Sequence, residues 1–181
     1  MNLGFTGEFE QKIDAKGRLL VPAKLRGVLE AEDPAYPGGT SSERGATLYL
    51  HYGSFLKNHL RIYSVEKFAE IAQGIRAMKK GSDQQRRASR MYLSQSMDLE
   101  VDPKDGRVVI PKRMRDMLGL PDGGSVFLTG VGDYFEIWRE DVFNETVHAP
   151  QMEWIEGQDG DFDPVTEIFP DDDASGDPLD L

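Results

Sequence analysis

The chain has 181 residues, of which 39% are hydrophobic, a size that allows one ordinary domain or two small ones. It contains no cysteine, which excludes disulfide bonds and thiolate metal sites and suits a reducing compartment. A formal net charge of −11 is unfavourable for binding nucleic acid, but residues 151–181 hold 11 of the 32 acidic residues and no Lys or Arg. Residues 1–150 therefore carry 21 acidic and 21 basic side chains and are neutral overall.

Neither export nor membrane insertion is expected. The first residues lack the basic start and the long apolar stretch of a secretory signal. No apolar run approaches the roughly 18 to 20 residues that span a bilayer as a helix. We therefore expect a soluble protein of the cytoplasm.

Residues 8–22, EFEQKIDAKGRLLVP, have the pattern of a β-hairpin followed by a helix start. Gly17 provides the positive φ that a short turn requires. Pro22 ends the second strand and suits the first turn of a helix, because its missing N–H is not needed there. The helix has an apolar stripe for the core, made of Leu25, Val28 and Leu29.

A loop and a second strand pair follow this helix. Residues 30–45 are rich in Gly, Pro and Ser, which predicts an inserted, mobile loop. LYLHY and LRIYS then have the pattern of two strands, and a helix is predicted to begin near Val65. These elements complete a first half that spans residues 1–68.

Residues 69–94 are predicted to form a pair of connecting helices. An apolar helical face precedes a break at Gly81, and the sequence Ser-Asp-Gln-Gln from Ser82 is typical of a capping box for a second helix. The apolar face consists of Phe68, Ile71, Ala72, Ile75 and Met78. The second helix carries Arg86, Arg87 and Arg90, a basic patch that is expected to be solvated or to bridge subunits.

The second half, residues 95–148, repeats the first. GRLLVP at residues 17–22 matches GRVVIP at residues 106–111, and LRIYSVEKF at residues 60–68 matches FEIWREDVF at residues 135–143. The repeated helix has its own predicted stripe of Met114, Met117 and Leu118, and a last helix is predicted near Glu140. The acidic tail, residues 149–181, has little apolar area to offset its ordering entropy and is predicted to be mostly disordered. Such a tail either solubilises the protein or competes with DNA for its basic surface.

The segments FTGEFEQKIDAKGRLLVPAKLR and LEVDPKDGRVVIPKRMR resemble the MraZ family, whose signature is an Asp-x-x-x-Arg hairpin motif present once in each half. The resemblance covers about residues 1–148. It implies a β-rich α+β fold, in which two pseudo-symmetric AbrB-like swapped-hairpin halves form a double-split β-barrel. It also implies a ring-like homo-oligomer that binds repeated sites in double-stranded DNA. Its expected role is that of a nucleoid-associated transcriptional regulator at the promoter of the cell division and cell wall gene cluster that includes its own gene.

The two motifs are not identical. Asp14 and Arg18 have the family spacing, whereas Asp102 precedes Arg107 by five residues, so the second turn is one residue longer. Either Asp102 or Asp105 therefore takes the place of the family Asp. Gly106 is the equivalent of Gly17. Whether this longer turn presents its basic residue to DNA is left open.

The hairpin tips are the predicted DNA contacts. Lys16 and Arg18 offer an ammonium and a planar guanidinium at a rigid strand end, which suits phosphate oxygens or guanine O6 and N7. The second tip offers Lys104 and Arg107. Further phosphate contacts are predicted from Lys24, Arg26, Lys112, Arg113 and Arg115. An alternative role for Arg18 is structural, because it can form a salt bridge with Asp14 across its own turn.

No catalytic, metal or cofactor site is predicted. His51, His59 and His148 lack the spacing of a helical metal pair and are expected to be ordinary core or surface residues, and no nucleotide-binding motif is present. The sequence therefore favours a DNA-binding regulator over an enzyme, with no small-molecule substrate. Two alternatives stay open: an antitoxin-like module whose tail binds a protein partner, and a structural ring without affinity for nucleic acid.

Overall fold

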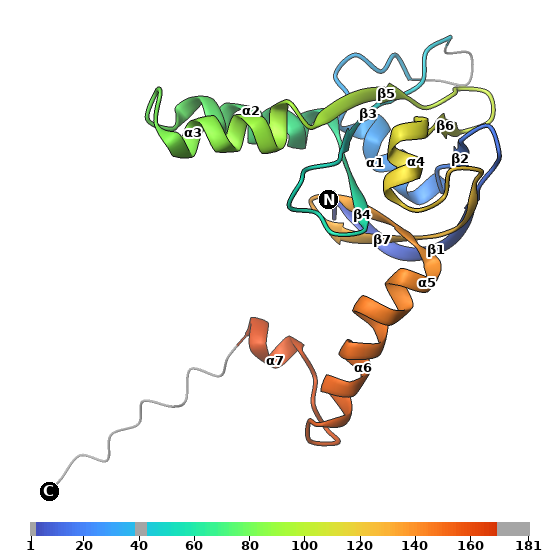
Figure 1. Ribbon diagram of the computed structural model, residues 1–181, viewed down its shortest axis with the longest axis vertical. Coiled ribbons are helices and arrows are strands. Elements are labelled where there is room, and N and C mark those ends of the chain that lie inside the picture. The colour runs from blue at the N-terminus through green and yellow to red at the C-terminus, as the bar shows by residue number, and fades with distance from the viewer. Residues whose placement is uncertain (1–2, 39–42, 170–181) are drawn as a thin grey trace, which may run out of the picture. The chain divides into compact units, whose positions relative to one another are not determined.

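The computed structural model describes residues 3–38 and 43–169 (Figure 1). The chain divides into two compact units, one ending at Phe143 and one beginning at Asn144. The first unit contains every strand that the structure describes, whereas residues 144–148 of the predicted second half belong to the second unit.

One antiparallel sheet of eight strands forms the body of the first unit, with the order β5-β3-β4-β8-β7-β1-β2-β6. The strands of the first half are β1 (Phe5–Ile13), β2 (Arg18–Leu20), β3 (Thr47–His51) and β4 (His59–Tyr63). Those of the second half are β5 (Ser96–Glu100), β6 (Arg107–Val109), β7 (Gly124–Gly132) and β8 (Phe135–Arg139). Each half thus supplies four strands in the same order, as the sequence repeat predicts.

The two halves are interlaced. Along its whole length β1 pairs with β7 of the other half, and β3 pairs in the equivalent way with β5. Two further pairs, β2 with β6 and β4 with β8, also join one half to the other. This is the expected swapped-hairpin arrangement. The pairs within a half, such as β1 with β2 and β3 with β4, are joined into one sheet only by strands of the other half.

The sheet curves into a nearly closed barrel. Its two end strands, β5 and β6, are linked by a hydrogen bond from Asp102 N to Arg107 O of 2.7 Å. The equivalent bond in the first half, from Asp14 N to Arg18 O, is 3.0 Å and links β1 to β2. The predicted double-split barrel of the β-rich α+β class is therefore confirmed.

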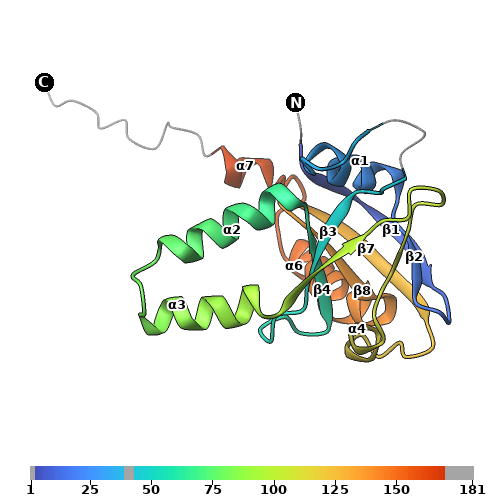
Figure 2. The same ribbon diagram turned by 90° about the horizontal axis from the view of Figure 1, so that it is seen from above.

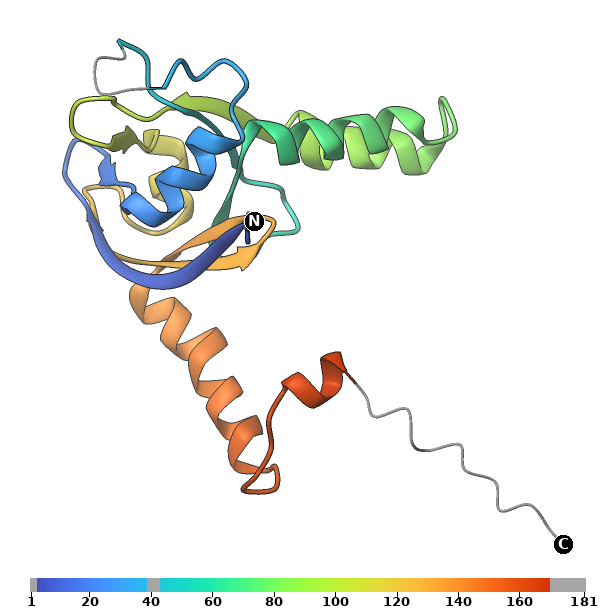
Figure 3. The same ribbon diagram turned by 180° about the vertical axis from the view of Figure 1, so that it is seen from behind.

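Two helices contribute to the barrel core. Helix α1 (Ala23–Ala31) buries Leu25 and Leu29, and α4 (Lys112–Met117) buries Met114, with Leu118 buried directly after it. Figures 1 and 3 show both helices within the curve of the strands. The prediction that Met117 also faces the core is wrong, since its side chain is 44% exposed. In so short a helix, Met114 and Leu118 lie one turn apart and already occupy the buried face.

The predicted connecting helices lie side by side, away from the barrel (Figure 2). Helix α2 (Val65–Ala77) begins at the predicted residue, and α3 (Asp83–Ala88) begins after the predicted cap, where Ser82 Oγ accepts from Gln85 N at 3.1 Å. The Gln85 side chain accepts from Gly81 N at 2.8 Å and donates to Ile75 O at 3.2 Å, so it ties the two helices together. A π-helical turn, η1 (Ser89–Leu93), continues α3 and was not predicted.

The segment expected to be a mobile insertion is anchored at its start. Asp33 is buried and accepts hydrogen bonds from Ala35 N and Thr47 N, both 2.9 Å. Although burial alone raises the pKa of Asp33, these two bonds hold it below its usual value. Residues 39–42 of the insertion lie outside the described residues.

The acidic tail contains more helix than its composition predicts. After α5 (Glu140–Phe143), which begins at the predicted residue, the second unit contains η2 (Asn144–His148), α6 (Ala149–Glu156) and α7 (Val165–Ile168). Pro150 in the first turn favours the start of α6, and the ring of Trp154 packs edge-on against Phe162 at 5.1 Å. Residues 170–181 lie outside the described residues. Of the helices that the structure describes, none is long and apolar enough to cross a membrane.

Candidate nucleic-acid interface

The first hairpin turn is organised by Asp14. Its Oδ1 accepts hydrogen bonds from Lys16 N and Arg18 N, both 2.9 Å, and its Oδ2 accepts from Arg18 Nε at 2.6 Å. The bond from the Arg18 backbone, with that from its side chain, holds the pKa of Asp14 below its usual value. The salt bridge considered as a structural role for Arg18 is therefore present.

Arg18 nevertheless keeps an exposed guanidinium edge. Its side chain is 50% exposed, and Asp14 engages only Nε. Neither of its Nη atoms donates a hydrogen bond to another residue among residues 3–38 and 43–169. Because a guanidinium presents five N–H groups, the pair with Asp14 fixes its direction and leaves the outer edge for a ligand.

The second turn divides the role of Asp14 between two residues. Asp102 Oδ1 accepts from Lys104 N at 2.7 Å, as Asp14 does from Lys16. Asp105 takes the other contacts, with Oδ1 accepting from Arg107 N at 3.0 Å and Oδ2 from Arg107 Nη1 at 3.2 Å. Both carboxylates therefore share the place of the family Asp, and the additional residue in the turn separates their contacts.

The four exposed side chains of β2 and β6 lie on one outward face. Arg18 pairs with Val109 across the strands, and Arg107 pairs with Leu20, while Leu19 and Val108 between them are buried. We call this face, made of Arg18, Leu20, Arg107 and Val109, the ribbon face. The two arginines thus lie diagonally across it, related by the internal repeat.

A groove of about 590 Å³ borders the ribbon face. Three basic and three acidic side chains line it together with three uncharged ones, namely Lys12, Arg18, Arg107, Glu10, Asp14, Glu140, Gln11, Leu20 and Ser125. Neither Lys12 nor the two apolar residues of the ribbon face were predicted as part of the site. The sequence does contain a pattern that predicts the two apolar residues. In the repeated strands RLL and RVV, the first and third residues point to the same side, so Leu20 and Val109 lie on the same face as the arginines.

The basic residues of α1 and α4 are largely engaged within the protein. Arg115 donates to Ile110 O at 3.2 Å, to Pro121 O at 2.7 Å and to Ala15 O at 3.4 Å, so it supports the first hairpin turn from the second half. Arg26 is the equivalent residue; it contacts the Gly106 turn and pairs with Glu30 at 3.5 Å.

The remaining helix residues are closer to the surface. Lys112 pairs with Asp116 at 2.9 Å, and the Arg113 guanidinium lies 5.3 Å from the centre of the Tyr52 ring. Lys24 is exposed beside β1. Lys16 and Lys104 are exposed at the two turns, so the structure brings them close to the arginines of the same hairpins.

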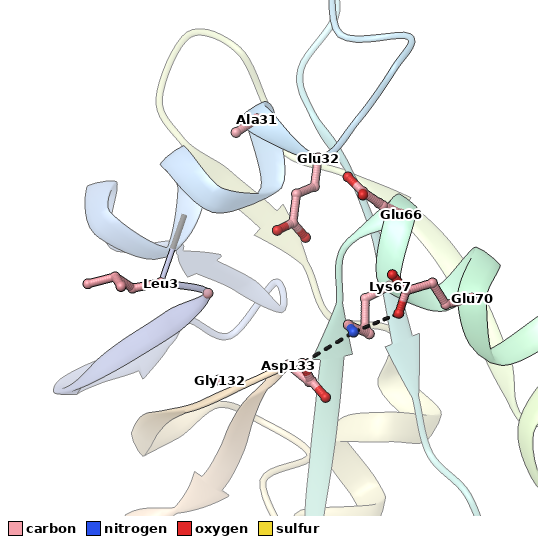
Figure 4. A pocket seen from close by; sticks show the side chains of 9 residues that line it. Leu3, Ala31, Glu32, Glu66, Lys67, Glu70, Gly132 and Asp133 are labelled. Atoms are coloured by element: carbon pink, nitrogen blue, oxygen red, sulfur yellow. Dashed lines mark hydrogen bonds and ion pairs between the residues drawn. The ribbon is translucent and has the colours of Figure 1, made fainter. Parts of the chain in front are cut away.

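A separate pocket of about 600 Å³ is acidic. Figure 4 shows Lys67 between Glu70 and Asp133, with Glu32 and Glu66 also lining the pocket. Lys67 Nζ lies 2.7 Å from Glu70 Oε2 and 3.3 Å from Asp133 Oδ1. Carboxylates outnumber the single cation, so this pocket disfavours phosphate. Within residues 3–38 and 43–169, no group of three or more His, Asp or Glu side chains is placed to hold a metal ion.

Two of the three histidines are packed side chains of the strands, as expected. His51 is fully buried and stacks on Tyr92 at 4.4 Å. Ser96 Oγ donates to Tyr92 O at 2.7 Å and therefore accepts the proton of His51 Nδ1 at 2.8 Å. Burial lowers the pKa of His51 to about 4, so this histidine is neutral at pH 7. His59 stacks on Trp138 at 4.2 Å.

Comparison with known proteins identifies relatives along most of the chain. The family model described as "MraZ protein, putative antitoxin-like" matches residues 5–38. A "Transcriptional regulator MraZ" of Ruegeria pomeroyi is 35% identical over 161 residues, which cover 89% of this chain and 92% of that protein. Proteins of the same name from Cereibacter sphaeroides and Thermoanaerobacter pseudethanolicus are 34% and 31% identical, over 81% and 77% of this chain and 86% and 83% of their own.

Proposed function

Since the chain belongs to the MraZ family, we propose that it is a transcriptional regulator that binds double-stranded DNA through the ribbon face and the two adjoining hairpin turns. The observation that carries this proposal is the position of Arg18 and Arg107, diagonally placed on one exposed two-stranded ribbon. A two-stranded ribbon fits the major groove of B-DNA, where a guanidinium pairs with guanine O6 and N7. This role requires no cofactor and no catalysis.

Within this proposal the basic residues have different tasks. Arg18 and Arg107 are held by Asp14 and Asp105 and face outward, which suits the reading of base edges. Lys16, Lys104 and Lys24 are exposed near the same strands and suit phosphate contacts. Arg26 and Arg115 act by positioning the turn of the opposite half, not by free phosphate contact.

Assembly is part of the proposal. A single ribbon is a small footprint, whereas specific protein–DNA interfaces bury about 1,000 Å² of protein surface or more. A ring-like homo-oligomer would present several ribbon faces to repeated sites and raise occupancy through effective concentration. We place these sites at the promoter of the cell division and cell wall gene cluster that includes the protein's own gene, so the protein would act on the nucleoid.

Binding to a labelled DNA fragment from upstream of the protein's own gene tests this function. Wild-type affinity should fall steeply as salt rises, and Arg18→Ala should reduce it about tenfold or more while the protein stays folded and oligomeric. Arg86→Ala is the matched control, since Arg86 lies on α3 and pairs with Asp83 there. Unchanged binding by Arg18→Ala would remove Arg18 from the interface, and no binding by the wild type would overturn the function.

A second function, an antitoxin-like module that binds a protein through its tail, is favoured by one observation. Residues 144–169 contain no Lys or Arg, and several of their apolar side chains are exposed, among them Trp154 at 49% and Phe169 at 73%. Such a segment suits coupled folding onto a basic partner. Deletion of residues 150–181 should leave DNA binding intact and remove a co-purifying protein if this function holds.

A further inference from the structure

Two exposed side chains of the ribbon face are apolar and therefore cannot bind phosphate. Leu20 is 36% exposed and Val109 is 56% exposed, on a ribbon face whose other members are Arg18 and Arg107. Their strand neighbours Leu19 and Val108 already point into the core, so the outward residues do not complete it. A face on which two apolar side chains alternate with two cations suits a ligand with both apolar and acceptor groups.

The spacing of the ribbon face corresponds to the spacing of base pairs. Residues two apart on a strand are about 6.6 to 6.8 Å apart, which is about two base-pair steps of 3.4 Å. Directly opposed residues of an antiparallel pair have their Cβ atoms about 4.5 to 5.5 Å apart. Arg18 with Val109, and Arg107 with Leu20, therefore form two adjacent pairs of one arginine and one apolar group.

The major groove offers one apolar group, the C5 methyl of thymine, beside the acceptors O6 and N7 of guanine. We infer that Leu20 and Val109 contact thymine methyl groups within one or two base pairs of the guanines that Arg107 and Arg18 read. This inference rests on the proposed function and specifies its DNA sequence. The internal repeat relates the two arginine–apolar pairs, so the guanine–thymine arrangement should occur twice, in inverted orientation.

DNA that differs only in these methyl groups tests the inference. The upstream fragment is amplified once with thymidine triphosphate and once with deoxyuridine triphosphate, which removes every thymine methyl and keeps the base pairing. Wild-type protein should bind the uracil fragment about fourfold more weakly for each methyl contacted, hence about 15-fold for two. The variant Leu20→Ala/Val109→Ala should bind both fragments with similar affinity.

A matched control separates contact from general surface effects. Val131→Ala removes an apolar side chain that is 48% exposed on β7 and not part of the ribbon face, so it should keep the wild-type preference for thymine. Arg18→Ala should weaken binding to both fragments. It should still bind the thymine fragment more tightly than the uracil fragment, because Leu20 is unchanged.

Three results would overturn the inference. Equal wild-type affinity for both fragments, with Arg18→Ala still weakened, would reject thymine contact and leave the proposed function standing. No wild-type binding to either fragment would reject both. A Leu20→Ala/Val109→Ala variant that loses its oligomeric state in size-exclusion chromatography, and weakens equally on both fragments, would make these residues an interface between copies of the chain.

Discussion

The backbone N–H of Ile110, in the second half, donates a 2.8 Å hydrogen bond to the carbonyl oxygen of Gly17, in the turn of the first hairpin. The repeat provides the equivalent bond, from Val21 N to Gly106 O at 3.0 Å. Each half therefore fixes the hairpin of the other. The position of Arg18 consequently depends on the second half of the chain as much as on its own turn.

Replacement of Gly17 by Ala should destabilise the protein. Gly17 has φ of 89°, and an added Cβ would lie 2.7 Å from Ile110 O, so both backbone strain and steric overlap oppose the change. We expect a loss of about 2 kcal/mol or more in the free energy of unfolding, measured by urea denaturation. Gly27→Ala is the control: it lies in α1 with open space around it, and should stabilise by about 0.5 to 1 kcal/mol. Equal effects of the two changes would refute this role for Gly17.

Arg115 should be important for stability despite its position in a basic helix. Its guanidinium donates to carbonyl oxygens of Ile110, Pro121 and Ala15, which lose these donors in Arg115→Ala. We expect a loss of about 1 to 3 kcal/mol in the free energy of unfolding. Arg115→Lys should restore only part of it, because one ammonium cannot reproduce the planar fork. Arg113 is exposed and contacts the partly buried Tyr52 ring, so Arg113→Ala should cost less than about 1 kcal/mol. An unchanged free energy of unfolding in Arg115→Ala would contradict the positioning role.

The Asp14 carboxylate should titrate below the ordinary value of 3.8, because backbone and side-chain N–H groups of Arg18 bind its charged form. Since its folded-state pKa is depressed, its contribution to stability is present above about pH 3.8 and is lost as the pH falls through the folded-state value. A carbon-detected NMR titration should find the Asp14 midpoint below 3.8, and in Arg18→Ala it should rise. A midpoint that is unaffected by Arg18→Ala would contradict the pair.

His51 should make the protein less stable in mild acid. Its folded-state pKa of about 4 lies below the ordinary value of 6.5, so the unfolded chain binds the proton more tightly. Stability is therefore retained above pH 6.5 and decreases as the pH falls toward 4, by about 2 kcal/mol at pH 5. Urea denaturation at pH 8 and pH 5 measures this loss. His51→Gln should reduce it, whereas replacement of the exposed His148 should not; an unchanged pH dependence in His51→Gln would assign the loss to other groups.

The order of the elements was predictable because it depends on local patterns. The repeat, the helix starts at Val65 and Glu140 and the cap at Ser82 follow from alternation, helical periodicity and side-chain hydrogen bonding within a few residues. The interlaced pairing of β1 with β7 came from the family resemblance, since no local pattern specifies which strand another will join.

The candidate site was only partly predictable. Its arginines belong to the repeated motif, but the sequence left open which aspartate takes the place of Asp14 in the second turn. The structure divides that role, because Asp105 binds Arg107 and Asp102 binds the backbone of Lys104. The engagement of Arg115 depends on carbonyl groups as distant in sequence as Ala15, so it is visible only in the folded chain. The exposure of Leu20 and Val109 likewise follows from the pairing of β2 with β6.

The central claim is that Arg18 reads guanine in the major groove. Methylation interference on the upstream fragment tests it directly, because methylation of guanine N7 blocks the acceptor that an arginine uses. Wild-type protein should be blocked by methylation of a few guanines, and Arg18→Ala should lose interference at one or more of them while keeping the others. An interference pattern that is identical for wild type and Arg18→Ala would contradict the account and place base recognition on another surface of the protein.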